Sequence, residues 1–382
     1  MRASSAYPQV SSRNYVRFVV VAVGVCFIFA FFADQPTVNE ESKLPGAEPS
    51  ASLRGREDTS LSLSSPRPSA GQAKLSDLIA VGLGLTEEAS QVIVTVKKEG
   101  REELKVKGLT KEGVEEPLTV ADTNSNNVFV NGYRNHFPGI QMLSEETEPE
   151  KSDTRIDNPT LPAGLTLESD PSLDLSEVLI IVDPLDATKE FGEETDKVTG
   201  ENLLGYVTTM VCVVYRGEPI AGIINQVFEE DKPPVVGVVP LRPGDNGVLF
   251  NRIKQTPAGE AAHTITISRS HTGEGGNVVE KYLPGHEALL AGGAGYKSLL
   301  VLDGKAEAYV HVTNIKSWDV CAANAVMRAS GGGFSDIEGK PLAYPMEYDS
   351  THSEAVFKNG IIATASMSQQ DFFVGKLDGH LS

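Results

Sequence analysis

VDPLDATKEF, residues 182–191, directly follows an apolar run, VLII. The run predicts a short buried strand that ends in two aspartates, Asp183 and Asp186. Pro184 stiffens the turn between them, so both carboxylates and the Leu185 carbonyl can point the same way. Hard cations such as Mg²⁺ prefer oxygen ligands of this kind. On its own, the segment is also typical of a turn whose aspartates are solvated or cap the backbone.

Further acidic side chains lie at the ends of predicted elements. Glu145 and Glu146 close the short strand GIQMLSEE. Asp319 opens the helix WDVCAANAVMRASGGG, and Asp122 lies in LTVAD near another helix start. Together with DPLD, these residues indicate a group of carboxylates at strand ends and helix starts.

Strands and helices mix along the rest of the chain. LSDLIAVGLGLTEEASQVIVTVKK, residues 75–98, has helical apolar spacing, whereas YVTTMVCVVYRGEPIAGIINQVF, residues 206–228, predicts a hairpin. Residues 98–116 are charged, residues 146–176 are polar and Pro-rich, and residues 229–261 are loop-rich. This mixture of hairpins and crossovers predicts a layered α+β architecture.

Composition and motifs exclude several function classes. The 382 residues include 52 acidic and 33 basic side chains, a net charge of −19, which disfavours a nucleic-acid polymer as partner. A small anionic ligand stays compatible, because bound divalent ions invert the local potential. The spacings of P-loop, dinucleotide-binding, zincin, α/β-hydrolase and EF-hand motifs are absent from the sequence.

The N-terminal region predicts a membrane anchor. FVVVAVGVCFIFAFFA, residues 18–33, has no charged residue, and basic residues precede it while acidic residues follow. This asymmetry predicts a cytosolic tail at 1–17 and a signal anchor at 18–33. A cleaved signal peptide is the rival reading, but no small-x-small site follows the run. Residues 34–71, rich in Ser and Pro, predict a flexible luminal stem before a folded region at 72–382.

The three cysteines form no CxxC pair or ligand cluster. Cys26 lies in the N-terminal apolar run, Cys212 in MVCVV and Cys321 in WDVCAANAV. Because each setting is apolar, three buried free thiols are expected.

The combination of EE, DPLDAT and WD at the head of a helix resembles the lithium-sensitive, magnesium-dependent phosphatase superfamily. This superfamily includes inositol monophosphatase, fructose bisphosphatase and the phosphoadenosine phosphatases. A closer similarity, to its Golgi-anchored phosphoadenosine phosphatases, covers about residues 74–380 and lies in ISRSHTG (267–273), AGGAGYK (291–297), YVHVTNIKSWDVCAANAV (309–326) and YVTTMVCVV (206–214). The resemblance implies an αβαβα sandwich of the inositol monophosphatase and fructose bisphosphatase type, with lobes near 72–235 and 260–382, preceded by one transmembrane helix.

The resemblance also implies roles for individual residues. The implied ligands of two or three Mg²⁺ ions are Glu145, Asp183, the Leu185 carbonyl, Asp186 and Asp319, with Glu146 the less favoured glutamate of its pair. Asp122 and Thr188 are implied to orient and deprotonate the attacking water. Four residues match positions near the 5′-phosphate and adenosine of the substrate: Ser268, His271, Gly293 and Lys297.

The implied activity is Mg²⁺-dependent hydrolysis of 3′-phosphoadenosine 5′-phosphate to AMP and phosphate. The implied location is the Golgi membrane, as a single-pass type II protein with a luminal catalytic domain, and a homodimer is a possible assembly. Lys189, the insertion 192–205 and the absence of a proline after IINQ depart from the family pattern. The first two border the site and bear on nucleotide preference and rate, so an inositol phosphate phosphatase is one alternative. A non-catalytic nucleotide-binding membrane protein is the other, although the presence of all the acidic residues and Thr188 argues against it.

Overall fold

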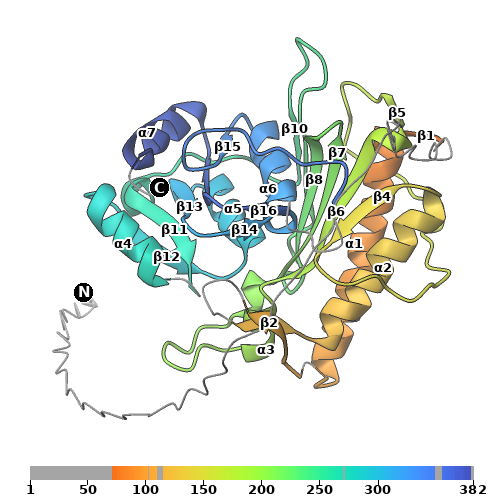
Figure 1. The fold of residues 1–382 in the computed structure, drawn as a ribbon, viewed down its shortest axis with the longest axis horizontal. Coiled ribbons are helices and arrows are strands. Elements are labelled where there is room, and N and C mark those ends of the chain that lie inside the picture. The colour runs from red at the N-terminus through yellow and green to blue at the C-terminus, as the bar shows by residue number, and fades with distance from the viewer. Residues whose placement is uncertain (1–70, 102, 110–114, 270–271, 349–354, 380–382) are drawn as a thin grey trace, which may run out of the picture. The chain divides into compact units, whose positions relative to one another are not determined.

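The computed structural model describes residues 71–101, 103–109, 115–269, 272–348 and 355–379 (Figure 1). The predicted tail, anchor and nearly all of the stem lie outside these ranges, as does the transmembrane helix of the predicted fold, so they stay predictions. The homodimer and the two lobes stay predictions as well.

The first part of the described chain forms a six-stranded sheet with the order β10-β9-β8-β7-β6-β4 and the helices that cover one of its faces. The elements of this part of the chain are β1 (Gln72–Lys74), α1 (Leu75–Lys98), β2 (Lys105–Leu109), β3 (Glu115–Leu118), α2 (Val120–His136), β4 (Gln141–Ser144), β5 (Ser172–Asp174), β6 (Val178–Asp186), α3 (Thr188–Glu193), β7 (Thr208–Tyr215), β8 (Glu218–Gln226), β9 (Val235–Val238) and β10 (Val248–Phe250). β1 with β5, and β2 with β3, form two separate two-stranded sheets.

The second part forms a five-stranded sheet with the order β12-β11-β13-β17-β15. The elements of this part of the chain are β11 (Thr264–Ser268), α4 (Thr272–Tyr282), β12 (Glu287–Ala291), α5 (Ala294–Leu302), β13 (Ala308–His311), β14 (Ile315–Lys316), α6 (Ser317–Ala329), β15 (Gly333–Ser335), β16 (Val356–Phe357), β17 (Ile361–Thr364) and α7 (Met367–Leu377). β14 and β16 form a separate two-stranded sheet.

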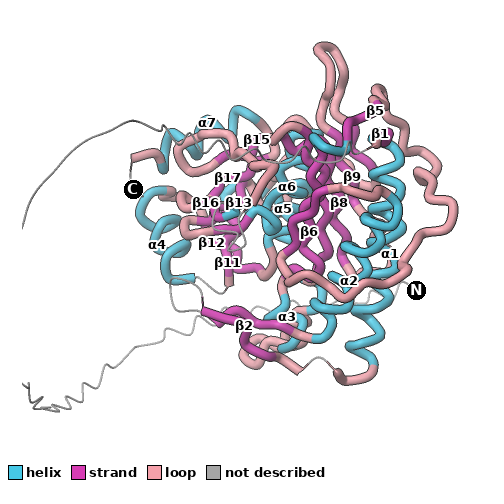
Figure 2. The backbone as a smooth tube through the Cα atoms, turned by 45° about the vertical axis from the view of Figure 1, so that its right-hand side comes forward, coloured by secondary structure: helices cyan, strands magenta, loops and turns pink. Residues whose placement is uncertain are grey.

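The layers follow the predicted αβαβα order. α1 and α2 cover one face of the six-stranded sheet, α5 and α6 lie between the two sheets, and α4 and α7 cover the outer face of the five-stranded sheet (Figures 1 and 2). All nine residues of β6 are buried, as its continuous apolar run requires of a strand covered on both faces. The predicted fold class is therefore confirmed for the described residues.

α1 is a core helix. Its apolar residues recur at helical spacing, and Leu78, Leu85 and Ile93 are fully buried. Within the described residues it is the one helix long and apolar enough to cross a membrane. Because α1 packs on α2, β7 and β8, its apolar composition is explained by the core of the sandwich.

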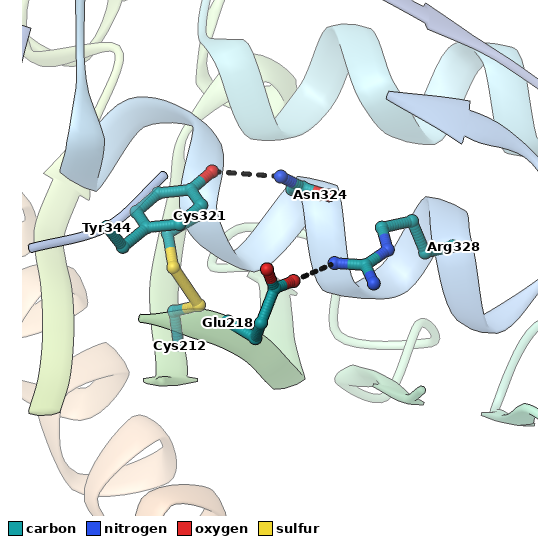
Figure 3. The surroundings of a disulfide bond; sticks show 6 residues. All are labelled: Cys212, Glu218, Cys321, Asn324, Arg328 and Tyr344. Atoms are coloured by element: carbon teal, nitrogen blue, oxygen red, sulfur yellow. Dashed lines mark hydrogen bonds and ion pairs between the residues drawn. A yellow bond between two sulfur atoms is a disulfide. The ribbon is translucent and has the colours of Figure 1, made fainter. Parts of the chain in front are cut away.

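The expectation of three free thiols is wrong for two cysteines. Cys212 in β7 and Cys321 in α6 form a disulfide, with their Cα atoms 5.7 Å apart (Figure 3). The two residues are 109 positions apart in the chain, so no local spacing motif could reveal the pair. They meet because α6 crosses the sheet over β7. Cys26 lies outside the described residues.

Candidate active site

The ends of β4 and β6 lie side by side at one edge of the six-stranded sheet. The strands are parallel and Ser144 pairs with Val182, so Glu145 and Asp183 follow at the same edge. Between Asp183 and Asp186 the pairing of β6 with β7 shifts by one residue. A bulge of this kind redirects side chains. Here it accompanies two buried aspartates at one strand end.

Asp122 and Thr188, the pair that the resemblance names, are hydrogen-bonded to each other. Asp122 lies in the first turn of α2, where its Oδ2 accepts hydrogen bonds from the Thr119 N–H at 2.7 Å and the Thr119 hydroxyl at 2.6 Å. The Thr188 hydroxyl donates to Asp122 Oδ1 at 2.7 Å and lies 3.1 Å from the Leu185 carbonyl oxygen. Ala187 has a φ of 70°, and this left-handed conformation turns the chain between Leu185 and Thr188. The pair is buried and fixed at both ends.

Helix N-termini hold two further aspartates. Asp186 accepts hydrogen bonds from the first two N–H groups of α5, at 3.1 and 2.8 Å, and from the Thr208 hydroxyl at 3.0 Å. Asp319 accepts one from the Lys316 N–H at 2.9 Å, at the start of α6. These hydrogen bonds fix the positions of both carboxylates. The two helix N-termini also stabilise negative charge on them.

Burial and, after it, neighbouring carboxylates raise the pKa values in the cluster. Burial raises the pKa of Asp122 to about 6, and burial together with Glu145 raises the pKa values of Asp319 and Glu146 to about 7. Burial and the neighbouring carboxylates, Glu145 first, raise the pKa of Asp183 as well. Burial, and after it the neighbouring carboxylates, therefore disfavour the ionised forms of these side chains in the metal-free protein.

These raised pKa values predict that the metal-free protein becomes more stable as the pH is lowered from about 8 to about 6. The pKa values of Asp122, Glu146 and Asp319 are raised in the folded state, so folding favours proton uptake. Their stabilising contribution is complete below about pH 4 and is lost as the pH rises through 6 to 7. Thermal unfolding in EDTA measures the effect, and saturating Mg²⁺ should flatten it. A melting temperature that falls steadily as the pH is lowered from about 8 to about 6 contradicts this account of the cluster.

Residues 74–370 match the model of the inositol monophosphatase family. The chain belongs to this family. It is 33% identical over 318 residues to inositol monophosphatase 3 of Xenopus laevis, covering 81% of this chain and 84% of the relative. It is 31% identical over 311 residues to the Golgi-resident adenosine 3′,5′-bisphosphate 3′-phosphatase of Rattus norvegicus, covering 78% of this chain and 80% of the relative.

Solved structures share the fold. The suhB protein of Bartonella henselae superimposes with a TM-score of 0.55 at 18% identity, covering 79% of this chain and 99% of that one. CysQ from Bacteroides thetaiotaomicron, described as a bacterial member of the inositol monophosphatase family, has a TM-score of 0.51 at 21% identity, covering 76% and 97%. The relatives' names are divided between inositol phosphate and adenosine bisphosphate substrates.

Lys107 is a charged residue of the site that sequence reasoning missed. The pairing of β2 with β3 is interrupted between Val106 and Gly108, and this bulge contains Lys107. Its Nζ lies 2.7 Å from Glu145 Oε1 and 2.6 Å from Glu146 Oε1. Burial alone lowers the pKa of Lys107, but the two glutamates raise it and keep the ammonium charged. The pKa of Glu146 is nevertheless raised, because burial and Glu145 outweigh Lys107.

Replacing Lys107 with methionine will destabilise the metal-free protein by about 1–2 kcal/mol. Breaking a buried ion pair costs about 3–5 kcal/mol. The Lys107 side chain is 23% exposed, so solvent screening reduces that figure. Thermal unfolding in EDTA measures the loss, and Mg²⁺ should restore most of it. Lys105→Met, on the same strand, is the control, and an equal loss in both variants contradicts the prediction.

A divalent cation fits the donors present. The predicted ligands supply oxygen only, and the Lys107 ammonium already bridges two of the carboxylates. In the described part of the chain, no group of three or more His, Cys, Asp or Glu side chains is already placed to hold an ion. The carboxylates accept hydrogen bonds from protein donors instead. The ligand roles of Glu145, Asp183, Leu185, Asp186 and Asp319 therefore stay predictions.

Gly293 lies beside Asp186, and Ser268 pairs with Ala291, two residues before Gly293. Ser268 ends β11, and Gly293 precedes α5 with a φ of 66°. A Cβ at Gly293 would lie 2.8 Å from Asp186 Oδ2, so a glycine is required for α5 to approach Asp186. His271 lies outside the described residues. Contact of these three residues with substrate stays a prediction.

Lys297 faces inward. Its Nζ lies 2.5 Å from the Gly293 carbonyl oxygen and 5.0 Å from the centre of the Tyr309 ring. Burial lowers the pKa of Lys297, and Asp186 opposes this shift; burial likewise raises the pKa of Asp186, against Lys297. Lys297 is 3% exposed, and its charge acts on Asp186 from within the protein. The second-phosphate contact predicted for it remains untested.

A second missed contact joins the insertion 192–205 to the predicted substrate loop. Arg269 Nη1 donates to Glu190 at 3.1 Å, and Arg269 Nη2 donates to Asp196 of the insertion at 2.5 Å. Glu190 is buried, and burial raises its pKa in spite of Arg269. Arg269 stands inside ISRSHTG, so a search for charged residues within that motif could have found it.

Proposed function

We propose that this inositol monophosphatase family phosphatase is a Mg²⁺-dependent enzyme that hydrolyses 3′-phosphoadenosine 5′-phosphate to AMP and phosphate. The Thr188–Asp122 hydrogen bond of 2.7 Å beside a buried carboxylate cluster carries the proposal. Phosphoryl transfer requires positioning and charge stabilisation more than covalent chemistry. The Thr188–Asp122 pair would position the attacking water, and a cation bound by the neighbouring carboxylates would stabilise the charge.

Thr188 and Asp122 move the proton of the attacking water. The Thr188 hydroxyl gives its proton to Asp122 Oδ1 and receives one from the water, whose oxygen forms the new bond to phosphorus. The bond between phosphorus and the 3′-oxygen breaks, and that oxygen takes a proton from solvent. The pKa of Asp122, about 6, leaves it ionised at neutral pH and able to accept the proton. Glu145, Asp183, the Leu185 carbonyl, Asp186 and Asp319 would hold Mg²⁺, which would supply positive charge against the phosphate and lower the pKa of the attacking water.

Two observations support a luminal location in the Golgi. Relatives from Rattus norvegicus and Mus musculus are named Golgi-resident, at 31% and 30% identity. The Cys212–Cys321 disulfide is typical of an oxidising compartment. A type II anchor at 18–33 would expose the catalytic region to that compartment.

The test is a substrate panel on the full-length protein purified in detergent. Phosphate release from 3′-phosphoadenosine 5′-phosphate, 3′-AMP and inositol 1-phosphate is measured with Mg²⁺ and with EDTA. The adenosine bisphosphate should have the highest kcat/KM, and EDTA should abolish release. Equal release in EDTA overturns the metal-dependent mechanism.

Inositol phosphate hydrolysis is the second candidate. The Xenopus laevis relative, at 33% identity, is named inositol monophosphatase 3. The same panel separates the two candidates, because a higher kcat/KM for inositol 1-phosphate overturns the nucleotide assignment and leaves the metal chemistry intact.

A further inference from the structure

The carboxylate cluster is assembled from separate elements. Asp183 and Asp186 lie at the end of β6, whereas Asp319 is the third residue of α6. The position of Asp319 relative to the two other aspartates therefore depends on how α6 is seated on the six-stranded sheet. Small displacements matter at a site whose ligands have to converge on bound ions.

The disulfide fixes the first turns of α6 to that sheet. Cys321 follows Asp319 by two residues, and its partner Cys212 lies in β7. In the pairing of β6 with β7, Cys212 stands opposite Ile181 and Met210 opposite Asp183. Cys321 is thus two residues from Asp319 in α6. Cys212 is two residues from Met210, which pairs with Asp183 across the two strands.

The neighbouring strand lets α6 approach this closely. Gly222 of β8 pairs with Cys212, and a Cβ at Gly222 would lie 2.2 Å from the Ala322 carbonyl oxygen of α6. Cys321 and Ala322 therefore rest directly on Cys212 and Gly222. Later turns of α6 have other contacts: the Asn324 amide donates to the Tyr344 hydroxyl at 3.0 Å, and Arg328 pairs with Glu218 (Figure 3).

We propose that Cys212 and Cys321 are positioning residues, and that their disulfide holds Asp319 in register with Asp183 and Asp186 for Mg²⁺ binding. The inference rests on the proposed Mg²⁺ site, but not on the identity of the phosphate ester. Disulfide formation removes two electrons and two protons from the thiols, which a disulfide-bearing oxidant of an oxidising compartment accepts. In the proposed luminal location the bond persists, and the site is complete only in the oxidised protein.

The first measurement establishes the bond. Mass spectrometry of the full-length protein, alkylated and digested without reductant, should show a peptide pair joined through Cys212 and Cys321 and an alkylated Cys26. Free thiols at positions 212 and 321 overturn the proposal.

The second measurement reports metal binding without turnover. Trp318 is the single tryptophan of the chain and adjoins Asp319, so its fluorescence can follow Mg²⁺ titration of the full-length protein. The double variant Cys212→Ala/Cys321→Ala should require about 10–100-fold more Mg²⁺ for half-saturation, the range typical when a residue that supports a ligand is removed. Cys212→Val/Cys321→Ala fills more of the space left by the two sulfur atoms and should show the same rise in the Mg²⁺ concentration at half-saturation.

The control is Tyr344→Phe. It removes the hydrogen bond that Asn324 donates to Tyr344. This contact of α6 lies about one helical turn further from Asp319 than the disulfide does. The variant should lower the melting temperature without moving the Mg²⁺ half-saturation point. A wild-type half-saturation point in both cysteine variants overturns the positioning role and leaves the proposed function standing. If the wild type itself shows no saturable response to Mg²⁺, by fluorescence or by calorimetry, the metal-dependent function falls and this proposal falls with it.

Discussion

Asp183→Asn will lower phosphate release by about 10³-fold and will raise the melting temperature of the metal-free protein. Asparagine keeps the shape of the side chain and the acceptor for the Leu185 N–H, which lies 3.2 Å from Asp183 Oδ1. It removes a negative charge from the predicted Mg²⁺ site, and several kcal/mol of transition-state stabilisation correspond to about three powers of ten in rate. Phosphate release at saturating Mg²⁺ measures the loss.

The rise in stability has a separate cause. Burial, Glu145 and the neighbouring aspartates raise the pKa of Asp183, so its ionised form is unfavourable in the folded metal-free protein at neutral pH. The neutral asparagine avoids this penalty. Asp174→Asn is the matched control, since hydrogen bonds from Ser176 lower the pKa of Asp174 and its neutralisation should not stabilise the fold. An Asp183→Asn protein that retains full activity contradicts the ligand assignment.

Much of the fold and most of the candidate site could be predicted, because the relevant residues stand where apolar runs end. The apolar run VLII predicts the buried strand β6, and the aspartates that follow it necessarily fall at one edge of the sheet. Asp319 and Asp122 occupy the first turns of α6 and α2, as their places before apolar helical runs indicate. The parallel pairing of β4 with β6 then brings Glu145 to Asp183.

The missed features depend on contacts between distant residues. The β2–β3 hairpin lies in a charged segment without apolar alternation, so neither its strands nor the bulge at Lys107 could be predicted. Lys297 is named by the resemblance as a substrate residue, but its inward direction follows only from the packing of α5. The disulfide joins residues 109 positions apart, and their proximity follows from the crossing of α6 over β7.

Thr188→Val will lower kcat by about 10²–10⁴-fold, the range typical for loss of proton transfer to a positioned group. Valine has nearly the same shape as threonine, so α3 and the left-handed turn at Ala187 are retained. The change removes the hydroxyl that donates to Asp122 Oδ1 at 2.7 Å. Because that hydrogen bond lowers the pKa of Asp122, its loss should raise this pKa further above about 6 and move the acid limb of the residual pH–rate profile upward. Thr188→Ser keeps the hydroxyl and should retain most of the activity.

The double variant Thr188→Val/Asp122→Asn decides whether the two residues act as one relay. If Thr188 carries the proton only because Asp122 accepts it, either single change removes the whole path, and the double variant loses about as much as the worse single one. Independent roles would instead multiply the two losses. The comparison requires folded proteins, and a melting curve in Mg²⁺ for each variant provides that check. Multiplicative losses, or a Thr188→Ser protein as slow as Thr188→Val, would exclude the relay and leave Thr188 as a packing residue beside Asp122.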